Sequence, residues 1–196
     1  MVDFSLFHTG ISNLFNVEEQ DNPTTPDLEF IRVNSGKANV YGVELNLGYG
    51  IPNKLQVELG YVEQRSRFNQ REPDFGSKDF FRTPNRYGIA SLNWKNPHLV
   101  DVFLGAKFTG SMKVPHYAGF IREDCLETTP FFLTLDANVS KSFAFGSDLN
   151  LIFSIGAKNL TNAYQGDLDQ GAERDAGYVY GPRFPRSIYT SIRFSF

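Results

Sequence analysis

The sequence predicts an all-β fold, in which about eight antiparallel strands form a segment of an up-and-down transmembrane β-barrel. Three observations lead to this class. Apolar and polar residues alternate over stretches of about ten residues, the length of a tilted strand that crosses a bilayer. Short turns and long polar loops alternate strictly between these stretches. Aromatic residues make up 15% of the chain, which is usual for a barrel with aromatic girdles.

The composition excludes several other classes. The 196 residues suffice to bury a sizeable core as one domain. Hydrophobic residues make up 41%, and no run of about 18 apolar residues occurs, so no transmembrane helix is expected. The net charge of −3 implies no nucleic-acid partner. Cys125 is the only cysteine, so we expect neither an internal disulfide nor a Cys-based metal site.

Four alternating segments occupy the first half of the chain. Val2 to about Asn16 opens with an apolar face of Val2, Phe4 and Leu6. The apolar face of Gly36–Tyr49 is formed by Tyr41, Val43, Leu45, Leu47 and Tyr49. In Lys54–Glu63 it is formed by Leu55, Val57, Leu59 and Tyr61. In Asn85–Trp94 it is formed by Ala90, Leu92 and Trp94, although Tyr87 and Ile89 blur the first part of that pattern.

Four more segments follow in the second half, which makes an even number of strands, as expected for this barrel class. The apolar face of Leu99–Thr109 is formed by Val100, Val102, Leu104, Ala106 and Phe108. In Phe131–Phe143 it is formed by Phe131, Leu133, Leu135, Ala137 and Val139. In Leu149–Leu160 it is formed by Leu149, Leu151, Phe153, Ile155 and Ala157. In Arg186–Phe196 it is formed by Ile188, Thr190, Ile192, Phe194 and Phe196.

The connections between the strands differ in length in a regular way. Three are tight turns with the Gly, Pro, Asn or Asp that turns require: Gly50–Asn53, Lys95–His98 and Gly146–Asp148. Four are long and polar: roughly Val17–Ser35, Gln64–Pro84, Gly110–Pro130 and Thr161–Pro185. The alternation places all turns at one end of the strands and all loops at the other. Transmembrane barrels have this asymmetry, with short periplasmic turns and long extracellular loops.

The polar faces of the strands carry charge, whereas the apolar faces carry large side chains. The charged residues on the polar faces are Glu44, Glu58, Asp101, Lys107, Asp136, Lys158 and Arg193. An apolar outer band suits outer-membrane lipid, and a charged face suits a water-filled or plugged lumen. The alternative is a soluble sandwich, in which the dry face points inward.

Several short motifs resemble one family. Lys158-Asn159-Leu160-Thr161-Asn162 with Tyr164, followed by Gly181-Pro182-Arg183 and Pro185-Arg186, looks like the C-terminal end of TonB-dependent outer-membrane receptors. Gly42-Val43-Glu44-Leu45, Thr83-Pro84-Asn85-Arg86 and Val114-Pro115-His116-Tyr117 are similar to internal pieces of the same family, particularly its Bacteroides-like versions. The terminal Phe196 resembles the aromatic residue that is part of the signal for the barrel-assembly machinery in such proteins.

The resemblance implies a barrel of about 22 strands plugged by an N-terminal domain. It implies the import of a scarce nutrient, such as siderophore-bound iron, haem or cobalamin, through the outer membrane of a Gram-negative bacterium, with energy from TonB. The chain shows no plug, no TonB box and no signal peptide. We therefore expect residues 1–196 to be the C-terminal part of the barrel, which would meet the TonB complex through a missing N-terminal region. The alternative is a stand-alone eight-stranded structural barrel.

Two groups of residues are candidates for ligand binding. The loop residues Asp167, Asp169, Glu173 and Asp175 supply carboxylates dense enough for Ca²⁺, although a solvated loop explains them equally. Tyr178, Tyr180, Arg183 and Arg186 could contact an anionic siderophore or haem propionates, or could belong to an aromatic girdle. His116 could ligate haem or a metal, but no other His or Cys is close to it in the sequence. No nucleophile and base are paired in an obvious way, so we expect no enzyme activity and no cofactor.

Overall fold

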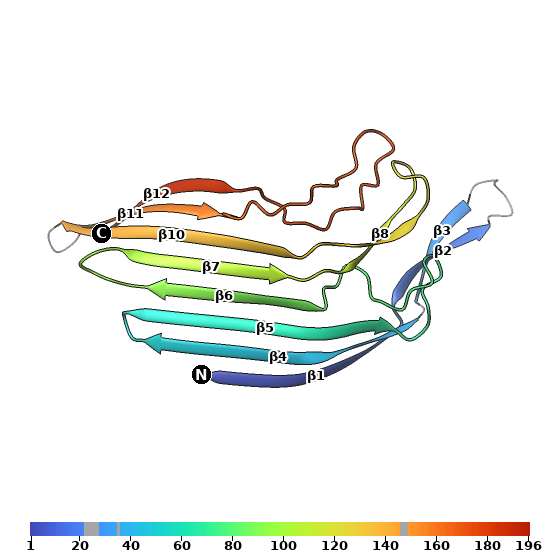
Figure 1. The fold of residues 1–196 in the computed structure, drawn as a ribbon, viewed down its shortest axis with the longest axis horizontal. Helices are drawn as coiled ribbons and strands as arrows, with labels where there is room; N and C mark the ends of the chain where they lie inside the picture. Colours follow the sequence, from blue (N-terminus) through green and yellow to red (C-terminus); the bar gives the residue numbers. More distant parts are fainter. Residues whose placement is uncertain (22–27, 35, 146–148) are drawn as a thin grey trace.

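The computed structural model describes residues 1–21, 28–34, 36–145 and 149–196. Its eight long strands form one antiparallel sheet in the order β1-β4-β5-β6-β7-β10-β11-β12, so the all-β prediction is confirmed (Figure 1). The strands are β1 (Val2–Ser12), β4 (Lys37–Ile51), β5 (Leu55–Phe68), β6 (Arg86–Trp94), β7 (Asp101–Thr109), β10 (Phe132–Phe145), β11 (Leu149–Lys158) and β12 (Ser187–Ser195).

The register of the sheet gathers the apolar side chains on one face. Leu104 on β7 lies opposite Leu92 on β6 and Ala137 on β10. Because directly opposite residues in an antiparallel pair project from the same side, each such pair extends one continuous apolar surface. Tyr87 and Ile89, which blurred the pattern of β6, lie on the polar face, where Ile89 is opposite Lys107.

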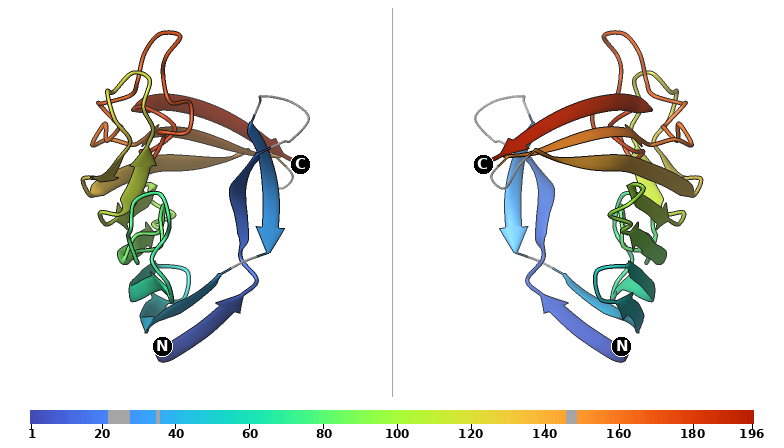
Figure 2. Two further views of the ribbon diagram at one scale, coloured as in Figure 1. Left: turned by 90° about the vertical axis from the view of Figure 1, so that its right-hand side faces the viewer. Right: turned by 90° about the vertical axis from the view of Figure 1, so that its left-hand side faces the viewer.

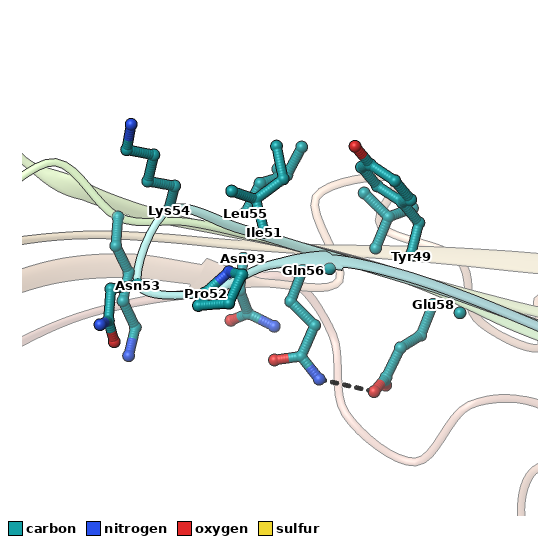
Figure 3. Close-up of a pocket in the computed structure, with 13 residues that line it drawn as sticks. Tyr49, Ile51, Pro52, Asn53, Lys54, Leu55, Gln56, Glu58 and Asn93 are labelled. Atoms are coloured by element: carbon teal, nitrogen blue, oxygen red, sulfur yellow. Dashed lines mark hydrogen bonds between the residues drawn. The ribbon is translucent and has the colours of Figure 1, made fainter. Parts of the chain in front are cut away.

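This apolar surface is not covered by other parts of the described chain. Phe4 and Phe194, on β1 and β12, are 61% and 62% exposed. Figure 3 shows the same division on the β4–β5 hairpin, where Tyr49, Ile51 and Leu55 project to the side opposite Gln56 and Glu58. An exposed apolar sheet face of this extent is suited to contact with lipid rather than water.

One tyrosine on the polar face depends on a glycine beneath it. Tyr189 on β12 is paired with Gly156 on β11. The Tyr189 hydroxyl accepts a hydrogen bond of 3.2 Å from Asn138 Nδ2 on β10. A side chain at Gly156 would collide with the Tyr189 ring and come within 2.8 Å of the same Nδ2 atom. Gly156 therefore lets Tyr189 lie flat across β11 and reach β10.

The predicted separation of turns and loops is confirmed where the structure describes it. The β4–β5 and β6–β7 turns lie at one end of the sheet and the long connections lie at the other (Figure 1). In the β6–β7 turn, Asn96 Oδ1 accepts hydrogen bonds from the N–H groups of His98 and Leu99 at 3.0 and 3.3 Å, the turn chemistry that Asn favours. The predicted turn Gly146–Asp148 lies outside the described residues.

Two of the long loops contain strands that the sequence did not predict. The loop after β1 holds β2 (Phe15–Asp21) and β3 (Leu28–Asn34), which pair with each other. The loop between β7 and β10 holds β8 (Lys113–His116) and β9 (Cys125–Thr128), which also pair with each other. The predicted segment Val2–Asn16 is divided after Ser12, because Asn13 has a positive φ of 57°. A four-residue strand that includes a proline is too short to show a periodicity.

Strand β5 is also longer than predicted, since it continues past Glu63 to Phe68 and pairs with the start of β4. The added residues are mostly polar, so no apolar alternation marked them. Seen along the strands, the sheet bends into an open arc (Figure 2). β1 and β12 are its edges, and each is paired on one side within the described sheet. The part of the chain that the structure describes holds no helix long and apolar enough to cross a membrane.

Candidate ligand-binding loop cluster

The connection between β11 and β12 is closed at its base by Asn159, the asparagine of the Lys158–Asn162 motif. Asn159 is 5% exposed and has a positive φ of 50°, which Asn tolerates better than most residues. Its Nδ2 donates to the carbonyls of Ala163 and Phe184, both at 2.9 Å, and its Oδ1 accepts from the N–H of Ala163 at 2.9 Å. One side chain thus joins the beginning and the end of the connection.

Two further residues of the motif strengthen this base. Asn162 Oδ1 accepts a hydrogen bond from the N–H of Arg186 at 3.1 Å. Thr161 Oγ1 donates to the carbonyl of Leu133 on β10 at 2.5 Å. The motif therefore attaches the connection both to its own far end and to the neighbouring strand of the sheet.

Gln165 brings the middle of the connection together. Its Nε2 donates to the carbonyl of Tyr178 at 3.0 Å, and its Oε1 accepts from the N–H of Tyr180 at 2.9 Å. The amide group of Gln165 is buried, so both hydrogen bonds are shielded from water. The two tyrosines are thereby held next to the acidic residues that follow Gln165.

Asp167 accepts hydrogen bonds from both tyrosine hydroxyls, at 3.0 Å from Tyr178 and 2.7 Å from Tyr180. Burial raises the pKa of Tyr180, and the Asp167 carboxylate raises it further, to about 12. The same two causes, in the same order, raise the pKa of Tyr178 even more. Partial burial acts to raise the pKa of Asp167, but the hydrogen bonds from Tyr180 and Tyr178 outweigh it and hold that pKa below its ordinary value.

His116 joins this arrangement from the other long loop. Its Nε2 lies 3.1 and 3.0 Å from the two carboxylate oxygens of Asp169. Its ring stacks on Tyr178 with centroids 3.6 Å apart and an angle of 8° between the planes. We call His116, Asp167, Asp169, Tyr178 and Tyr180 the loop cluster. The cluster connects loops that are more than fifty residues apart in the chain.

The loop between β5 and β6 contributes through Arg82. Its guanidinium donates to the carbonyls of Gly177 and Val179, at 2.6 and 3.1 Å. In addition, Asp175 accepts from the N–H of Tyr117 at 3.1 Å. Three of the four long loops are therefore fastened to one another beyond the end of the sheet, on the side where Figure 1 shows the loops.

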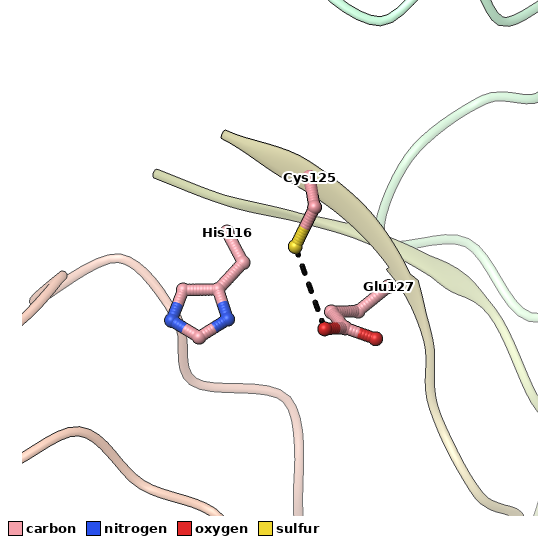
Figure 4. A group of neighbouring side chains, drawn as sticks. All are labelled: His116, Cys125 and Glu127. Carbon is pink, nitrogen blue, oxygen red and sulfur yellow. Dashed lines mark hydrogen bonds between the residues drawn. The ribbon is translucent and has the colours of Figure 1, made fainter. Parts of the chain in front are cut away.

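A second group of polar side chains lies beside the loop cluster. The potential ligand atoms of His116, Cys125 and Glu127 all lie within 4.8 Å of one another (Figure 4). The thiol of Cys125 donates a weak hydrogen bond of 3.4 Å to Glu127 Oε1. Burial raises the pKa of this thiol, and the hydrogen bond and charge of Glu127 add to the effect. Sequence reasoning missed this group, although the spacing of Cys125 and Glu127 matches the period of a strand.

The structure brings together three of the four predicted acidic residues but gives each a separate role. Asp167 bonds the tyrosines, Asp169 bonds His116, and Asp175 Oδ1 accepts from the N–H of Gly177 at 2.7 Å. Glu173 is exposed. In the described part of the chain these residues form no common group of ligand atoms, and calcium binding at this loop stays a prediction.

Arg183 is not part of the loop cluster but lines a hollow at the end of the sheet, which Tyr180 of the cluster also lines. Residues of the polar face of the strands, among them Lys107, Asp136 and Lys158, line the same hollow. Of the charged residues that line it, three are cationic and one is anionic. Tyr178, by contrast, is 3% exposed and belongs to the interior of the loop cluster rather than to the outer surface of the sheet.

Strands of this length and facing, joined alternately by turns and by long loops, are typical of a transmembrane β-barrel. A family model described as TonB dependent receptor-like, beta-barrel matches residues 1–160. The chain belongs to this family of outer-membrane receptors and transporters, as its motifs indicated. No curated protein matches the chain.

Solved structures similar to this chain include siderophore and iron receptors. The ferric-catecholate import receptor Fiu of Escherichia coli K12 is 23% identical with a TM-score of 0.66, over 99% of this chain and 25% of that one. The ferripyoverdine receptor of Pseudomonas aeruginosa, bound to ferripyoverdine, is 18% identical with a TM-score of 0.68, over 100% and 25%. The FrpB iron transporter of Neisseria meningitidis is 16% identical with a TM-score of 0.62, over 99% and 28%. The chain thus spans about a quarter of these structures.

Proposed function

We propose that residues 1–196 are the C-terminal part of the barrel of a TonB-dependent transporter that imports an iron–siderophore complex. The proposal that the chelate is anionic rests on the hollow beside Arg183. Lys107, Lys158 and Arg183 line it together, against Asp136 alone. A concave site with excess positive charge raises the local concentration of anions and favours carboxylate or catecholate groups.

The phenol of Tyr180 adds a neutral polar group to the lining of this hollow. Its high pKa keeps the hydroxyl protonated at physiological pH, and its proton is donated to Asp167, so the phenol oxygen brings no negative charge to the hollow. Haem, with its propionates, has the same anionic character, whereas cobalamin needs no such cationic lining. Of the nutrients that the family imports, we therefore rank ferric siderophores and haem above cobalamin.

The whole protein would need partners beyond this chain. We propose that it resides in the outer membrane of a Gram-negative bacterium, with its apolar face against lipid. We further propose that it is assembled by the barrel-assembly machinery through the terminal Phe196, and that it takes energy from the TonB complex through an N-terminal region. Loss of uptake in cells that lack TonB, with unchanged ligand binding, is the expected result for the energy source.

The direct test measures binding by the complete protein that carries this chain, purified in detergent. Titration with a ferric catecholate, a ferric hydroxamate, haem and cobalamin should give binding of one of the two ferric siderophores and none of cobalamin. Arg183→Gln should weaken binding about tenfold or more, because it removes a charged hydrogen-bond donor worth roughly 1.5–3 kcal/mol. Arg174→Gln is the matched control, since Arg174 is exposed and, among the described residues, donates to the carbonyl of Gly171 within its own loop. Binding of haem or cobalamin without binding of either ferric siderophore would overturn the proposal.

A further inference from the structure

The hairpin β8–β9 places three different metal-ligand side chains on one of its faces. His116 is the direct partner of Cys125 across the pair, and directly opposite residues project from the same face with Cβ atoms about 5 Å apart. Glu127 is two residues beyond Cys125 on β9, and the strand period of two returns it to that face. The sequence and pairing of this hairpin are sufficient to gather the imidazole, the thiol and the carboxylate.

His116 is held with one ring nitrogen directed at the other two groups. The carboxylate of Asp169 accepts from the N–H of Asp175 at 2.9 Å as well as facing Nε2. A carboxylate in this position is an acceptor, so in the neutral ring it favours the tautomer with the proton on Nε2 and the lone pair on Nδ1. Figure 4 shows the other ring nitrogen on the side of Cys125 and Glu127.

The orientation of this ring is constrained in two more ways. Stacking on Tyr178 fixes the plane of the imidazole, and only 5% of His116 is exposed. A histidine whose second nitrogen is bonded to a carboxylate is the usual arrangement for a metal ligand, because the carboxylate sets the tautomer and raises the basicity of the ligating nitrogen. The contact with Asp169 therefore orients the ring so that the Nδ1 lone pair can bind an ion.

We propose that His116 Nδ1, Cys125 Sγ and the Glu127 carboxylate form a binding site for a divalent transition-metal ion of the zinc class. One nitrogen, one sulfur and one oxygen suit a borderline ion, whereas Ca²⁺ and Mg²⁺ require oxygen ligands. The three atoms, within 4.8 Å of one another, need only small side-chain rotations to reach metal–ligand distances of about 2.0–2.3 Å. Glu127 is exposed, so water can occupy the fourth position.

Binding of the ion releases a proton from the site. The Sγ–H proton that Cys125 now donates to Glu127 leaves to solvent, and the thiolate and the carboxylate both turn toward the metal. The bound ion would link the β8–β9 hairpin to Asp169 through the His116 ring. This role is separate from the proposed uptake of a chelate, because none of the three ligands lines the hollow beside Arg183.

Cobalt substitution tests the site in the complete protein that carries this chain, purified in detergent without chelator. One equivalent of Co²⁺ should produce a thiolate-to-cobalt charge-transfer band, and Zn²⁺ should displace it. Cys125→Ser should abolish the band, and Glu127→Gln should weaken binding. Glu123→Gln, which removes a neighbouring exposed carboxylate outside the group, is the control and should leave both unchanged. Asp169→Asn should keep the band but lower the affinity roughly 10–100-fold, as loss of a supporting carboxylate does.

A second measurement needs no variant and so does not depend on how well a variant folds. Stoichiometric Zn²⁺ should protect Cys125 from a thiol reagent, Mg²⁺ should not, and a chelator should restore the reaction. Failure of Co²⁺ to give a thiolate band with the unaltered protein, or equal labelling of Cys125 with and without Zn²⁺, would overturn the proposal. Tight binding that survives both Cys125→Ser and Glu127→Gln would place the ion elsewhere and would also overturn it.

Discussion

Replacing Asp167 by Asn should loosen the loop cluster without disturbing the sheet. The Asp167 carboxylate accepts hydrogen bonds from the hydroxyl groups of Tyr178 and Tyr180, at 3.0 and 2.7 Å. Asn has nearly the same shape but no charge and only one acceptor oxygen, so one hydroxyl keeps a neutral hydrogen bond and the other loses its acceptor. The change is confined to the loops, because Asp167 lies far along the connection from either strand.

The expected loss of free energy in the loop cluster follows from the kind of hydrogen bond that is lost. A bond to a charged group contributes about 1.5–3 kcal/mol and a neutral one about 0.5–1.5 kcal/mol. Replacing two charged bonds by one neutral bond would give a difference of at least about 2 kcal/mol, but Asp167 is exposed and solvent screens its charge, so we take about 1 kcal/mol. That free energy corresponds to roughly a fivefold change in the opening equilibrium of the loop.

Hydrogen exchange of the loop amides measures this equilibrium. The N–H of Tyr180, which is bonded to Gln165, should exchange about five times faster in Asp167→Asn at pH 7. Amides of β10 and β11 should be unaffected. Glu173→Gln is the matched control, since it removes a charge from the same loop where the structure describes no hydrogen bond of that side chain.

The same variant should show a defined pH dependence. The folded-state pKa of Asp167 lies below its ordinary value of 3.8, so its contribution is complete above that value and disappears as the pH falls through the lower folded-state pKa. After correction for intrinsic exchange rates, the unaltered protein and the variant should therefore converge in acid. Equal protection of both at pH 7, or a difference that persists in acid, would refute the role assigned to the Asp167 charge.

Three other predictions concern facing, topology and packing. Leu151→Arg, at a lipid-facing site, should reduce barrel assembly more than Asn150→Arg, because Arg costs about 2–4 kcal/mol at the bilayer midplane; heat-dependent electrophoretic mobility measures assembly. A membrane-impermeant thiol reagent should label Cys125 on intact cells treated with a chelator, which removes any ion bound to the thiol, and Cys125→Ser should abolish the labelling. Gly156→Val should displace the Tyr189 ring and lower the thermal stability of the barrel, since the added side chain would occupy the space of that ring.

Each of these predictions has an outcome that contradicts it. Equal damage from the two arginine substitutions would mean that the facing of β11 is not as stated. Labelling of Cys125 only after the outer membrane is broken would invert the assignment of loops and turns. Gly166→Val serves as the control for Gly156→Val, because an added side chain at Gly166 meets nothing within 4 Å; equal losses from both would argue against the collision with Tyr189.

Periodicity predicted the eight strands of the sheet because each has one apolar face, and a strand with such a face cannot slip by one residue without exposing it to the wrong medium. The same reasoning could not find the end of β5. There the polar residues from Gln64 to Arg67 pair with β4, but they form no apolar face. It also missed β8 and β9, which are four residues each. In these places backbone pairing, not side-chain polarity, determines the structure.

The candidate site was predictable as a set of residues but not as an arrangement. Sequence reasoning selected His116, Asp169 and Tyr178 separately, yet His116 and Asp169 are 53 residues apart and no local pattern relates them. Their contact arises because the sheet brings two long loops to the same end. The Lys158–Asn162 motif was noticed only as a resemblance, and its physical role appears in the hydrogen bonds of Asn159.

The closure by Asn159 and Gln165 has a consequence for how the long loop can change in evolution. The two side chains divide the connection into a fastened base and a tip, 166–177, whose ends are already held together. Doubling the length of a loop whose ends are held costs only about 0.6 kcal/mol in chain entropy. Insertions near Gly171, where an added side chain meets nothing, would therefore lengthen the tip while the base and the barrel stay as they are. Such a connection can acquire new surface for new ligands without being refolded.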